Sequence, residues 1–88
     1  MKYVKNIEWL EAEVKDELLM MHADSGRFVS LNDTGTFLWN RMGEPRDVAT
    51  LARDLAAEFD VSEQQARSDV GEWIATMCEH DVLVEDAG

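Results

Sequence analysis

The stretch GRFVSLNDTG, residues 26–35, marks the point where the hydrophobic pattern of the chain changes. Residues 27–31 are rich in aromatic and β-branched side chains, which favour a β-strand. Asn32 follows at once, and asparagine often caps a helix because its side chain accepts a hydrogen bond from a free backbone N–H group. The stretch therefore predicts a strand that leads directly into a helix.

Upstream of this stretch, the sequence predicts two further strands. Residues 10–15 alternate apolar and charged side chains, a period of two that is typical of a half-buried strand. The apolar members, expected on the buried face, are Leu10, Ala12 and Val14. Residues 18–22 form a second strand that is apolar on both faces, after a tight turn at 15–17. Residues 24–26 favour the next turn. Such a three-stranded meander is marginal alone and needs a helical cover.

Three helices are predicted downstream, each by a capping residue followed by apolar residues at helical spacing. The first starts after Asn32 and ends at Gly43 and Pro45. The second follows Asp47, and the third follows Ser62 and runs to about residue 80. The expected inner faces are Phe37, Leu38, Trp39 and Met42, then Val48, Leu51, Ala52, Leu55 and Phe59, then Ala66, Val70, Trp73 and Met77.

These elements together predict the fold class. Strands over about 8–31 and helices over about 33–80 give an α+β domain, in which a three-stranded antiparallel sheet is followed by a three-helix bundle. The tail at residues 82–84 is expected to pack as a short strand or to cover the end of the core. With 88 residues, the chain has room for one domain, over residues 1–88.

The charge of the chain is strongly negative. Eight Lys and Arg residues face nineteen Asp and Glu residues, which gives a net charge of −11. Residues 1–48 hold nine acids and six bases, a net of −3, whereas residues 49–88 hold ten acids and two bases, a net of −8. This field repels nucleic acids and attracts a cationic partner. The alternative is that the acidity only keeps a small protein in solution.

Nothing in the sequence predicts a membrane span or a signal peptide. No apolar run approaches the length of a spanning helix, and the segment after Lys5 is too charged for a signal peptide. The single cysteine, Cys78, excludes an internal disulfide and agrees with a reducing compartment. We therefore expect a soluble, cytoplasmic protein.

Catalytic and metal-binding patterns are lacking in the sequence as well. The glycines do not have the spacing of a phosphate-binding loop. Cys78 and His80 lie two residues apart on a predicted helix, so their side chains diverge, and His22 is distant in sequence. We expect no catalytic residue, no metal and no cofactor, and hence no enzyme.

Several of these residues resemble a known family. The run at residues 26–35, followed by Leu38-Trp39 and Gly43, is similar to the signature GRYxxLNxTG…(I/L)W…G of the PqqD-like family, the RiPP recognition elements. The likeness extends over about residues 10–84. The chain departs from the family pattern at Pro45-Arg46-Asp47, where a Thr cap is commoner, at Gly71, where an aliphatic residue is usual, and at Asp81, where Gly often ends the last helix.

The resemblance implies a fold and a function. Members of this family resemble winged helix-turn-helix proteins and bind the leader segment of a ribosomally made precursor peptide between the third strand and the third helix. A separate or fused enzyme then modifies the peptide: a radical SAM enzyme, a leader peptidase as in lasso-peptide pathways, or a cyclase. The expected state is a monomer or weak dimer, and neither nucleic acid nor membrane is an expected partner.

An edge strand can accept an extended peptide as an added strand, which is how the third strand would contribute to such a site. On the third helix, a stripe of partly small residues lies beside the core stripe. Its Gly71 costs about 1 kcal/mol relative to Ala, so it fits close approach of a second backbone or a tight contact within the fold. The predicted peptide-binding residues are Arg27, Phe28, Val29, Ser30 and Leu31 in the strand and Arg67, Val70, Gly71, Ile74 and Cys78 in the helix.

Two other functions are compatible with the element order. A winged-helix nucleic-acid binder would need basic residues on its recognition helix, whereas residues 62–80 hold Arg67 against four acids. A structural accessory subunit that stabilises a larger enzyme is the second alternative. Peptide binding by the isolated chain would separate this alternative from a leader-binding protein.

Overall fold

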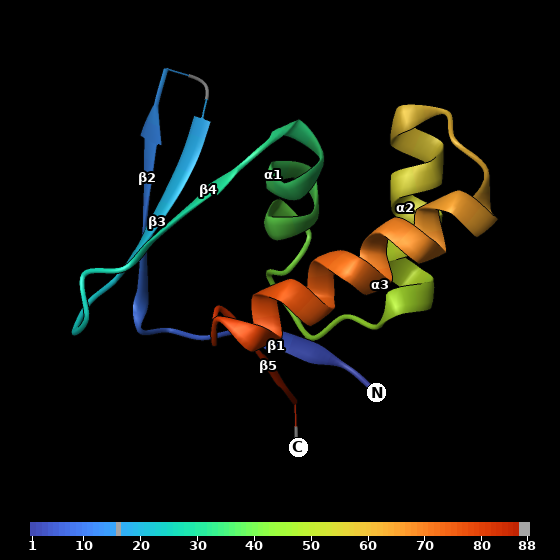
Figure 1. Ribbon diagram of the computed structural model, residues 1–88. Helices are drawn as coiled ribbons and strands as arrows, with labels where there is room; N and C mark the ends of the chain where they lie inside the picture. Colours follow the sequence, from blue (N-terminus) through green and yellow to red (C-terminus); the bar gives the residue numbers. More distant parts are fainter. Residues whose placement is uncertain (16, 87–88) are drawn as a thin grey trace.

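The structure, a computed structural model, describes residues 1–15 and 17–86 and has the predicted α+β architecture (Figure 1). In chain order the elements are β1 (Tyr3–Lys5), β2 (Trp9–Val14), β3 (Glu17–His22), β4 (Phe28–Leu31), α1 (Asp33–Asn40), α2 (Val48–Phe59), α3 (Glu63–Glu79) and β5 (Leu83–Glu85). Strands β2, β3 and β4 form an antiparallel sheet with β3 in the middle. Helix α1 lies between this sheet and the α2–α3 pair.

The two ends of the described chain pair with each other. Strand β5 confirms one of the two expectations for the tail, and its partner is β1, a strand that the sequence did not predict. Tyr3 also exchanges two backbone hydrogen bonds with Arg46, of 2.8 and 3.1 Å. Val82 and Leu83 are fully buried, so this small sheet closes one end of the core.

All three predicted helix caps are confirmed. The side chains of Asn32, Asp47 and Ser62 each accept a hydrogen bond from the backbone N–H three positions on, at 2.8, 2.8 and 3.1 Å. Gln65 follows Ser62 at the spacing of a capping box, which predicts a hydrogen bond from its side chain back to residue 62, but the side chain donates to Asp69 instead, at 2.9 Å. Each helix therefore begins where its cap predicted. Helix α1 ends at Asn40, a turn earlier than expected.

The turns of the sheet depend on backbone conformation. Gly26 has φ +73°, a backbone conformation that residues other than glycine rarely adopt. Its N–H donates to the carbonyl of His22 at 3.0 Å. This confirms the predicted turn before β4. The other predicted turn, at residues 15–17, includes Asp16, which lies outside the described residues.

The core forms where the sheet, α1 and the α2–α3 pair meet. Most of the predicted helix positions are buried in it, while Phe37, Val48 and Trp73 pack at its edge and Phe59 is exposed. The buried residues are Trp9, Leu18, Met20, Leu31, Leu38, Trp39, Met42, Leu51, Ala52, Leu55, Ala66, Val70, Ile74, Met77, Val82 and Leu83.

The prediction for the buried face of β2 was wrong. Leu10, Ala12 and Val14 are exposed, and Trp9, at the first position of the strand, is buried instead. Glu11 pairs with the fully buried Met20, so the glutamate lies on the helix side of the sheet. It is stabilised there because the indole N–H of Trp39 donates to its carboxylate at 2.7 Å. The apolar alternation therefore predicted the strand correctly but predicted the wrong buried face.

Candidate functional site

Strand β4 is an edge of the three-stranded sheet, because its only strand partner in the described chain is β3. The first pair of this ladder is anchored by His22, whose N–H donates to the carbonyl of Arg27 at 2.9 Å. On the other side of β3, the N–H of Ala23 donates to the carbonyl of Glu8 at 2.9 Å. Both bonds fix the same alternation: even-numbered residues of β3 bond to β4, and odd-numbered residues bond to β2.

This alternation decides which backbone groups of β4 are free. Val29 pairs with Met20 and Leu31 with Leu18, so the N–H and C=O groups of Val29 and Leu31 point toward β3. The backbone groups of Phe28 and Ser30 point the other way, where the described residues provide no partner. The open edge therefore offers two N–H and two C=O groups to an added strand.

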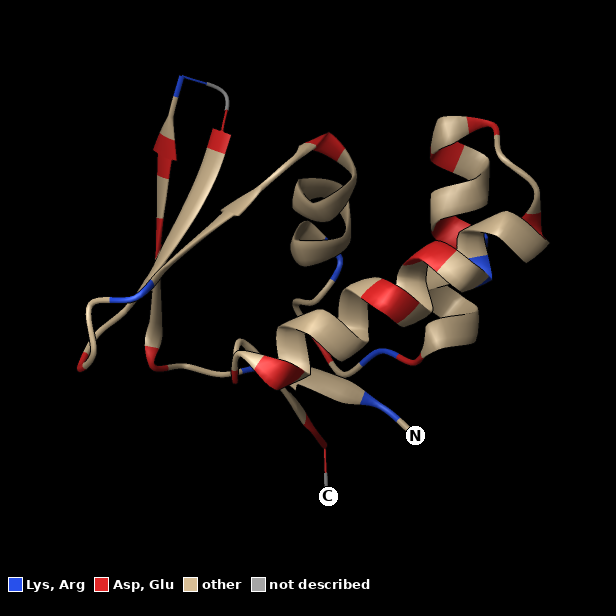
Figure 2. Cartoon of the chain, viewed as in Figure 1, with Lys and Arg blue, Asp and Glu red and all other residues tan. Residues whose placement is uncertain are grey.

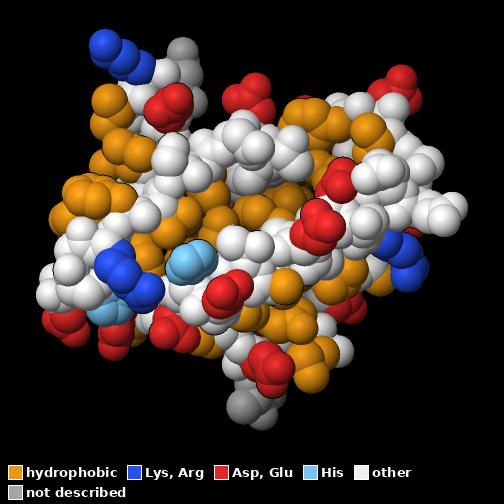
Figure 3. Space-filling model, viewed as in Figure 1, with side chains coloured by type: hydrophobic (Ala, Val, Ile, Leu, Met, Phe, Trp, Pro, Cys, Tyr) orange, Lys and Arg blue, Asp and Glu red, His pale blue; other side chains and the backbone are white. Residues whose placement is uncertain are grey.

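A cavity of about 500 Å³ lies between this edge and α3. Figure 3 shows it as part of a hollow with apolar side chains, between β4 and α3. Its lining residues are Trp9, Arg27, Phe28, Val29, Thr76 and His80. A second cavity, of about 590 Å³, lies at the far end of β4 and is lined by Glu17 and residues 30–34.

The helix side of the groove consists of residues that recur at helical spacing. Thr76 and His80 line the cavity, and Trp73 lies one turn before them. Trp73 reaches α1, because a Cβ atom on Gly35 would lie 3.3 Å from the indole nitrogen of Trp73 and 3.3 Å from Leu31. A side chain at residue 35 would press on both groups, so glycine leaves room for this approach. The Trp73 indole N–H is buried, and no described residue accepts a hydrogen bond from it.

Of the predicted site residues, the structure brings Arg27, Phe28 and Val29 to the 500 Å³ cavity and Ser30 and Leu31 to the second one. The predicted helix residues line neither cavity. Val70 and Ile74 are buried in the core. The others, Arg67, Gly71 and Cys78, lie on the opposite flank of α3 from Thr76, since each residue advances about 100° around a helix.

Trp9, Thr76 and His80 line the 500 Å³ cavity but are not among the predicted peptide-binding residues. The apolar periodicity predicted the buried stripe of α3 correctly. A flank of the helix lies on each side of this stripe. One carries Thr76 and His80, and the other carries Gly71 and Cys78. The small residues Gly71 and Cys78 favoured the second flank as the peptide-binding side, whereas the cavity lies along the first. No signal within α3 itself distinguishes the flanks, because β4 determines which of them faces the groove.

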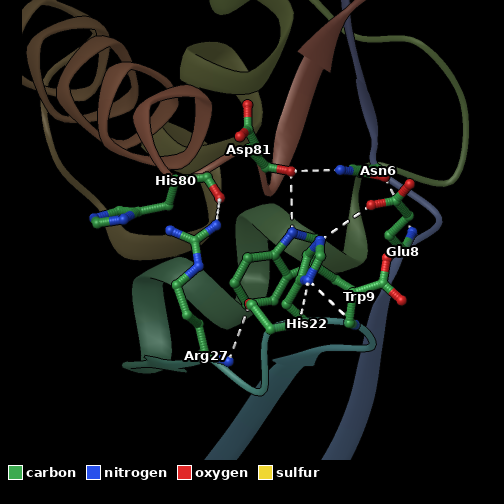
Figure 4. A network of polar contacts seen from close by, with 9 residues as sticks. Asn6, Glu8, Trp9, His22, Arg27, His80 and Asp81 are labelled. Carbon is green, nitrogen blue, oxygen red and sulfur yellow. Dashed lines mark hydrogen bonds and ion pairs between the residues drawn. The ribbon is translucent and has the colours of Figure 1, made fainter.

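Arg27 closes one end of the groove. Its guanidinium group donates to the carbonyl of His80 at 3.2 Å and lies 5.6 Å from the centre of the Trp9 ring (Figure 4). The indole of Trp9 in turn donates to the carbonyl of Asp81 at 3.0 Å, and the amide of Asn6 donates to the same oxygen at 2.8 Å. These contacts hold the start of β4 against the end of α3.

His22 organises the turn that precedes β4. Its Nδ1 accepts hydrogen bonds from the backbone N–H groups of Asp24 and Ser25, at 3.3 and 3.1 Å. Because Nδ1 accepts, the ring donates through Nε2–H, to the Glu8 carboxylate at 3.0 Å. The ring also packs edge-on against Trp9 at 5.3 Å. The turn is thus held by side chains that adjoin the groove.

The described residues contain no group of three or more His, Cys, Asp or Glu side chains arranged to hold a metal ion. Burial raises the pKa of the Cys78 thiol, with Glu85 and Asp81 adding to the effect, and this disfavours a reactive thiolate. No helix in the described part of the chain is long and apolar enough to cross a membrane.

Acidic side chains gather along α3. Figure 2 marks acidic residues at several positions along α3, and Figure 3 shows acidic side chains on the face of the molecule that carries the hollow. The helix and the two residues that follow it hold Glu63, Asp69, Glu72, Glu79 and Asp81 against one base, Arg67. The helix side of the groove is therefore negative, and Arg27 provides a positive charge at one end.

Comparison with known proteins gives one family and two solved structures. Residues 17–83 match the family model described as Coenzyme PQQ synthesis protein D (PqqD). The structure of TbiB1 in complex with the TbiA(beta) leader peptide superposes with a TM-score of 0.84 at 18% identity, covering 97% of this chain and 99% of that one. Lasso peptide synthetase B1 complexed with the leader peptide gives 0.83 at 21% identity, covering 97% and 100%. No curated protein sequence matches. At these identities the two structures show a shared fold.

Proposed function

The chain belongs to the PqqD family, and from this premise we propose that it is a RiPP recognition element, a protein without catalysis of its own that binds the leader segment of a precursor peptide. The observation that carries the proposal is the open edge of β4 beside the cavity against α3. The two solved structures support it, since each of those proteins is described with a leader peptide bound.

The proposed binding mode is the addition of a fourth strand. An extended peptide pairs with the outward N–H and C=O groups of Phe28 and Ser30, which supplies affinity without regard to its side chains. Successive side chains of a strand point to opposite faces. One set therefore enters the groove toward α3, and the other set extends the face of the sheet that carries Phe28.

Selectivity comes from the groove. The Trp9 ring and Val29 give the cavity an apolar floor, while Thr76 and His80 provide polar groups at the helix side. A cavity of about 500 Å³ is within the range that binds small ligands or a few side chains. We expect it to take apolar side chains of the leader, with polar groups of the peptide near Thr76 and His80.

The protein then presents the bound peptide to a modifying enzyme, which is a radical SAM enzyme, a leader peptidase or a cyclase. This chain forms and breaks no covalent bond in that process. Its contribution is to raise the local concentration of the precursor at the enzyme and to hold the leader extended. The remainder of the precursor stays free for the enzyme.

Proline substitution at the edge tests this proposal. Ser30→Pro removes an outward N–H group and leaves the ladder to β3 intact, whereas Val29→Pro would break that ladder. The matched control is Glu13→Pro on β2, the other edge of the sheet, where the N–H also points outward. Calorimetric titration with synthetic segments of the precursor peptide should show a loss of about tenfold or more for Ser30→Pro, because a peptide carbonyl is left unpaired.

The control should bind like the wild type. Equal affinities for Ser30→Pro and wild type, with circular dichroism showing both folded, would remove the β4 edge from the site. Failure of the wild-type chain to bind any segment of the precursor would favour a structural accessory subunit instead.

A further inference from the structure

Trp73 holds a buried hydrogen-bond donor that the fold does not use. Its indole nitrogen is the one buried side-chain nitrogen or oxygen without a hydrogen-bond partner in the described part of the chain. The other two tryptophans differ, since the indole of Trp9 donates to Asp81 at 3.0 Å and that of Trp39 donates to Glu11 at 2.7 Å. Buried polar groups nearly always have a partner, because an unpaired one loses its hydrogen bonds to water without replacement. The unused donor of Trp73 therefore calls for a physical reason.

The packing around this donor also has a cost to the fold. A Cβ atom at residue 35 would lie 3.3 Å from the indole nitrogen, so glycine at this position leaves room for the ring. Gly35 belongs to α1, and glycine is the poorest helix former apart from proline. A phenylalanine at residue 73 would bury apolar surface without an unpaired donor. The fold alone thus explains neither the nitrogen of Trp73 nor the glycine beside it.

The donor lies beside the proposed peptide-binding edge. Trp73, Thr76 and His80 are three and four residues apart, so they share the flank of α3 that faces the groove. Helix α1 lies between the sheet and α3 (Figure 1), and the indole reaches the junction of β4 and α1 next to Leu31. Leu31 directly follows Ser30, whose backbone N–H and C=O groups point to the open edge. A peptide paired with Ser30 therefore passes close to the indole.

A rotation of the Trp73 side chain brings its donor to such a peptide. Trp73 is only partly buried at the edge of the core, whereas Val70, Ile74 and Met77 on the same helix are buried. Part of the ring therefore borders the groove while the nitrogen stays covered. Because the indole N–H has no partner among the described residues, turning the ring to another rotamer breaks no hydrogen bond.

We propose that the indole N–H of Trp73 donates to an oxygen acceptor of the bound leader, and that the ring turns toward the groove when the peptide binds. The acceptor is a carbonyl or carboxylate oxygen of the leader, in its backbone or in a side chain. The inference deepens the proposed function and rests on it. It makes Trp73 a specificity residue, because a peptide without an acceptor at this point leaves the donor unpaired and binds more weakly.

The test removes the N–H group and keeps the ring. Site-specific replacement of Trp73 by β-(3-benzothienyl)alanine exchanges the N–H group for sulfur in a ring of nearly the same shape. The matched control carries the same replacement at Trp39, whose N–H is used within the fold. Calorimetric titration with synthetic segments of the precursor peptide measures affinity, and urea denaturation measures stability. Trp73→Phe serves as a second variant and assigns the indole signal of Trp73 in ¹H–¹⁵N spectra.

Replacement at Trp73 should lower peptide affinity about tenfold, the effect of a hydrogen bond left unmade to a buried group. Its urea midpoint should stay the same or rise, because the free protein loses only an unpaired donor. Replacement at Trp39 should lower the urea midpoint and leave peptide affinity unchanged. In the wild type, the indole signal of Trp73 should move downfield as the peptide segment is added, while that of Trp39 should stay in place.

Equal affinities of the wild type and the Trp73 replacement would overturn the inference, as would an indole signal that does not move. A loss of stability as large as that at Trp39 would also overturn it, by showing that the N–H serves the free fold. Double-mutant cycles with alanine substitutions or backbone esters in the peptide identify the acceptor as side chain or backbone, and coupling at no position contradicts the proposal. If the wild type binds no segment, the proposed function itself fails, which is a separate result.

Discussion

The guanidinium group of Arg27 donates a hydrogen bond to the carbonyl oxygen of His80, so that one side chain spans the groove from the start of β4 to the end of α3. The same guanidinium lies over the ring of Trp9, which is held to Asp81 by its indole N–H. The strand side and the helix side of the groove are thereby fixed at one end. The contact therefore closes the groove at the start of β4, next to a peptide bound on the β4 edge.

Arg27→Ala should weaken peptide binding severalfold. The substitution removes the contact that fixes the width of the groove. Part of the binding free energy must then be spent on ordering the two sides of the groove. The free energy of unfolding should fall by about 1 kcal/mol, the usual effect of one lost hydrogen bond. Urea denaturation and calorimetric titration measure the two effects. Arg67→Ala removes the same charge from the opposite flank of α3 and serves as the control. An equal loss of affinity in both variants would show a charge effect rather than a bridge.

Thr76→Phe should block the groove. Thr76 is exposed and lines the cavity, so a phenyl ring at this position occupies space that the leader needs, and folding changes little. Leader affinity should fall tenfold or more in a titration, with a nearly unchanged melting temperature. Ala75→Phe places the same ring one position earlier, outside the cavity lining, and should bind like the wild type. Strong binding by Thr76→Phe would move the peptide away from α3.

Gly71→Ala should stabilise the protein by up to about 1 kcal/mol, since glycine is the poorer helix former. A Cβ atom at residue 71 meets no described atom within 4 Å, so the methyl group causes no clash. Because Gly71 lies on the flank of α3 away from Thr76, leader affinity should not change. Thermal denaturation and titration check both points. Loss of leader binding would return Gly71 to the site, where the sequence had placed it.

The position of Gly71, on the flank of α3 away from the cavity, illustrates what a local sequence pattern does not determine. The caps at Asn32, Asp47 and Ser62 are local hydrogen bonds, so the sequence predicts the helix starts well. Apolar periodicity likewise predicts most of the core positions of the helices. The flank of α3 that lines a groove depends on a strand more than thirty residues away, and no local pattern encodes that position.

The orientation of β2 is a second case of this limit. Alternation predicts which side chains share a face, but burial of that face depends on distant partners. Here Glu11 faces the helices because Trp39 donates to it and Lys5 lies 3.8 Å from its carboxylate. Lys5 also lies 4.4 Å from the centre of the Trp39 ring. The apolar side chains left outside by this arrangement, Leu10, Ala12 and Val14, are exposed on the other face of the sheet.

Acid should weaken the start of α2 through Asp47. Hydrogen bonds from the backbone and then the side chain of Thr50 lower the pKa of this carboxyl below its ordinary value of 3.8. The folded state thus favours the charged form, so the contribution to stability is present above about pH 4 and is lost as the pH falls through the lowered pKa. Asp47→Asn keeps a capping side chain and should flatten this part of the pH dependence.

Urea midpoints between pH 6 and pH 2.5 measure that effect. Glu58→Gln, an exposed substitution at the other end of α2, is the control and should leave the acid limb of the profile in place. An identical acid limb in wild type and Asp47→Asn would show that the cap does not contribute to acid sensitivity.

Salt should slow the association of the leader while changing its dissociation little. Residues 49–88 carry a net charge of −8, and acidic side chains follow α3 beside the groove, so the field favours a leader that carries Lys or Arg. Steering of this kind acts on the association rate and decays as the Debye length shrinks from about 10 Å at 0.1 M to about 3 Å at 1 M salt. Backbone pairing and apolar contacts are far less sensitive.

Stopped-flow measurements from 50 mM to 1 M salt test this prediction. The variant Glu72→Gln/Glu79→Gln should make the association rate less dependent on salt concentration. Glu13→Gln, on the distant hairpin, should reduce this dependence less. Duplex DNA should not bind at any of these concentrations, because the acidic helix repels phosphate. An association rate that is flat across the range would assign the acidity to solubility alone, and tight DNA binding would overturn the peptide-binding proposal.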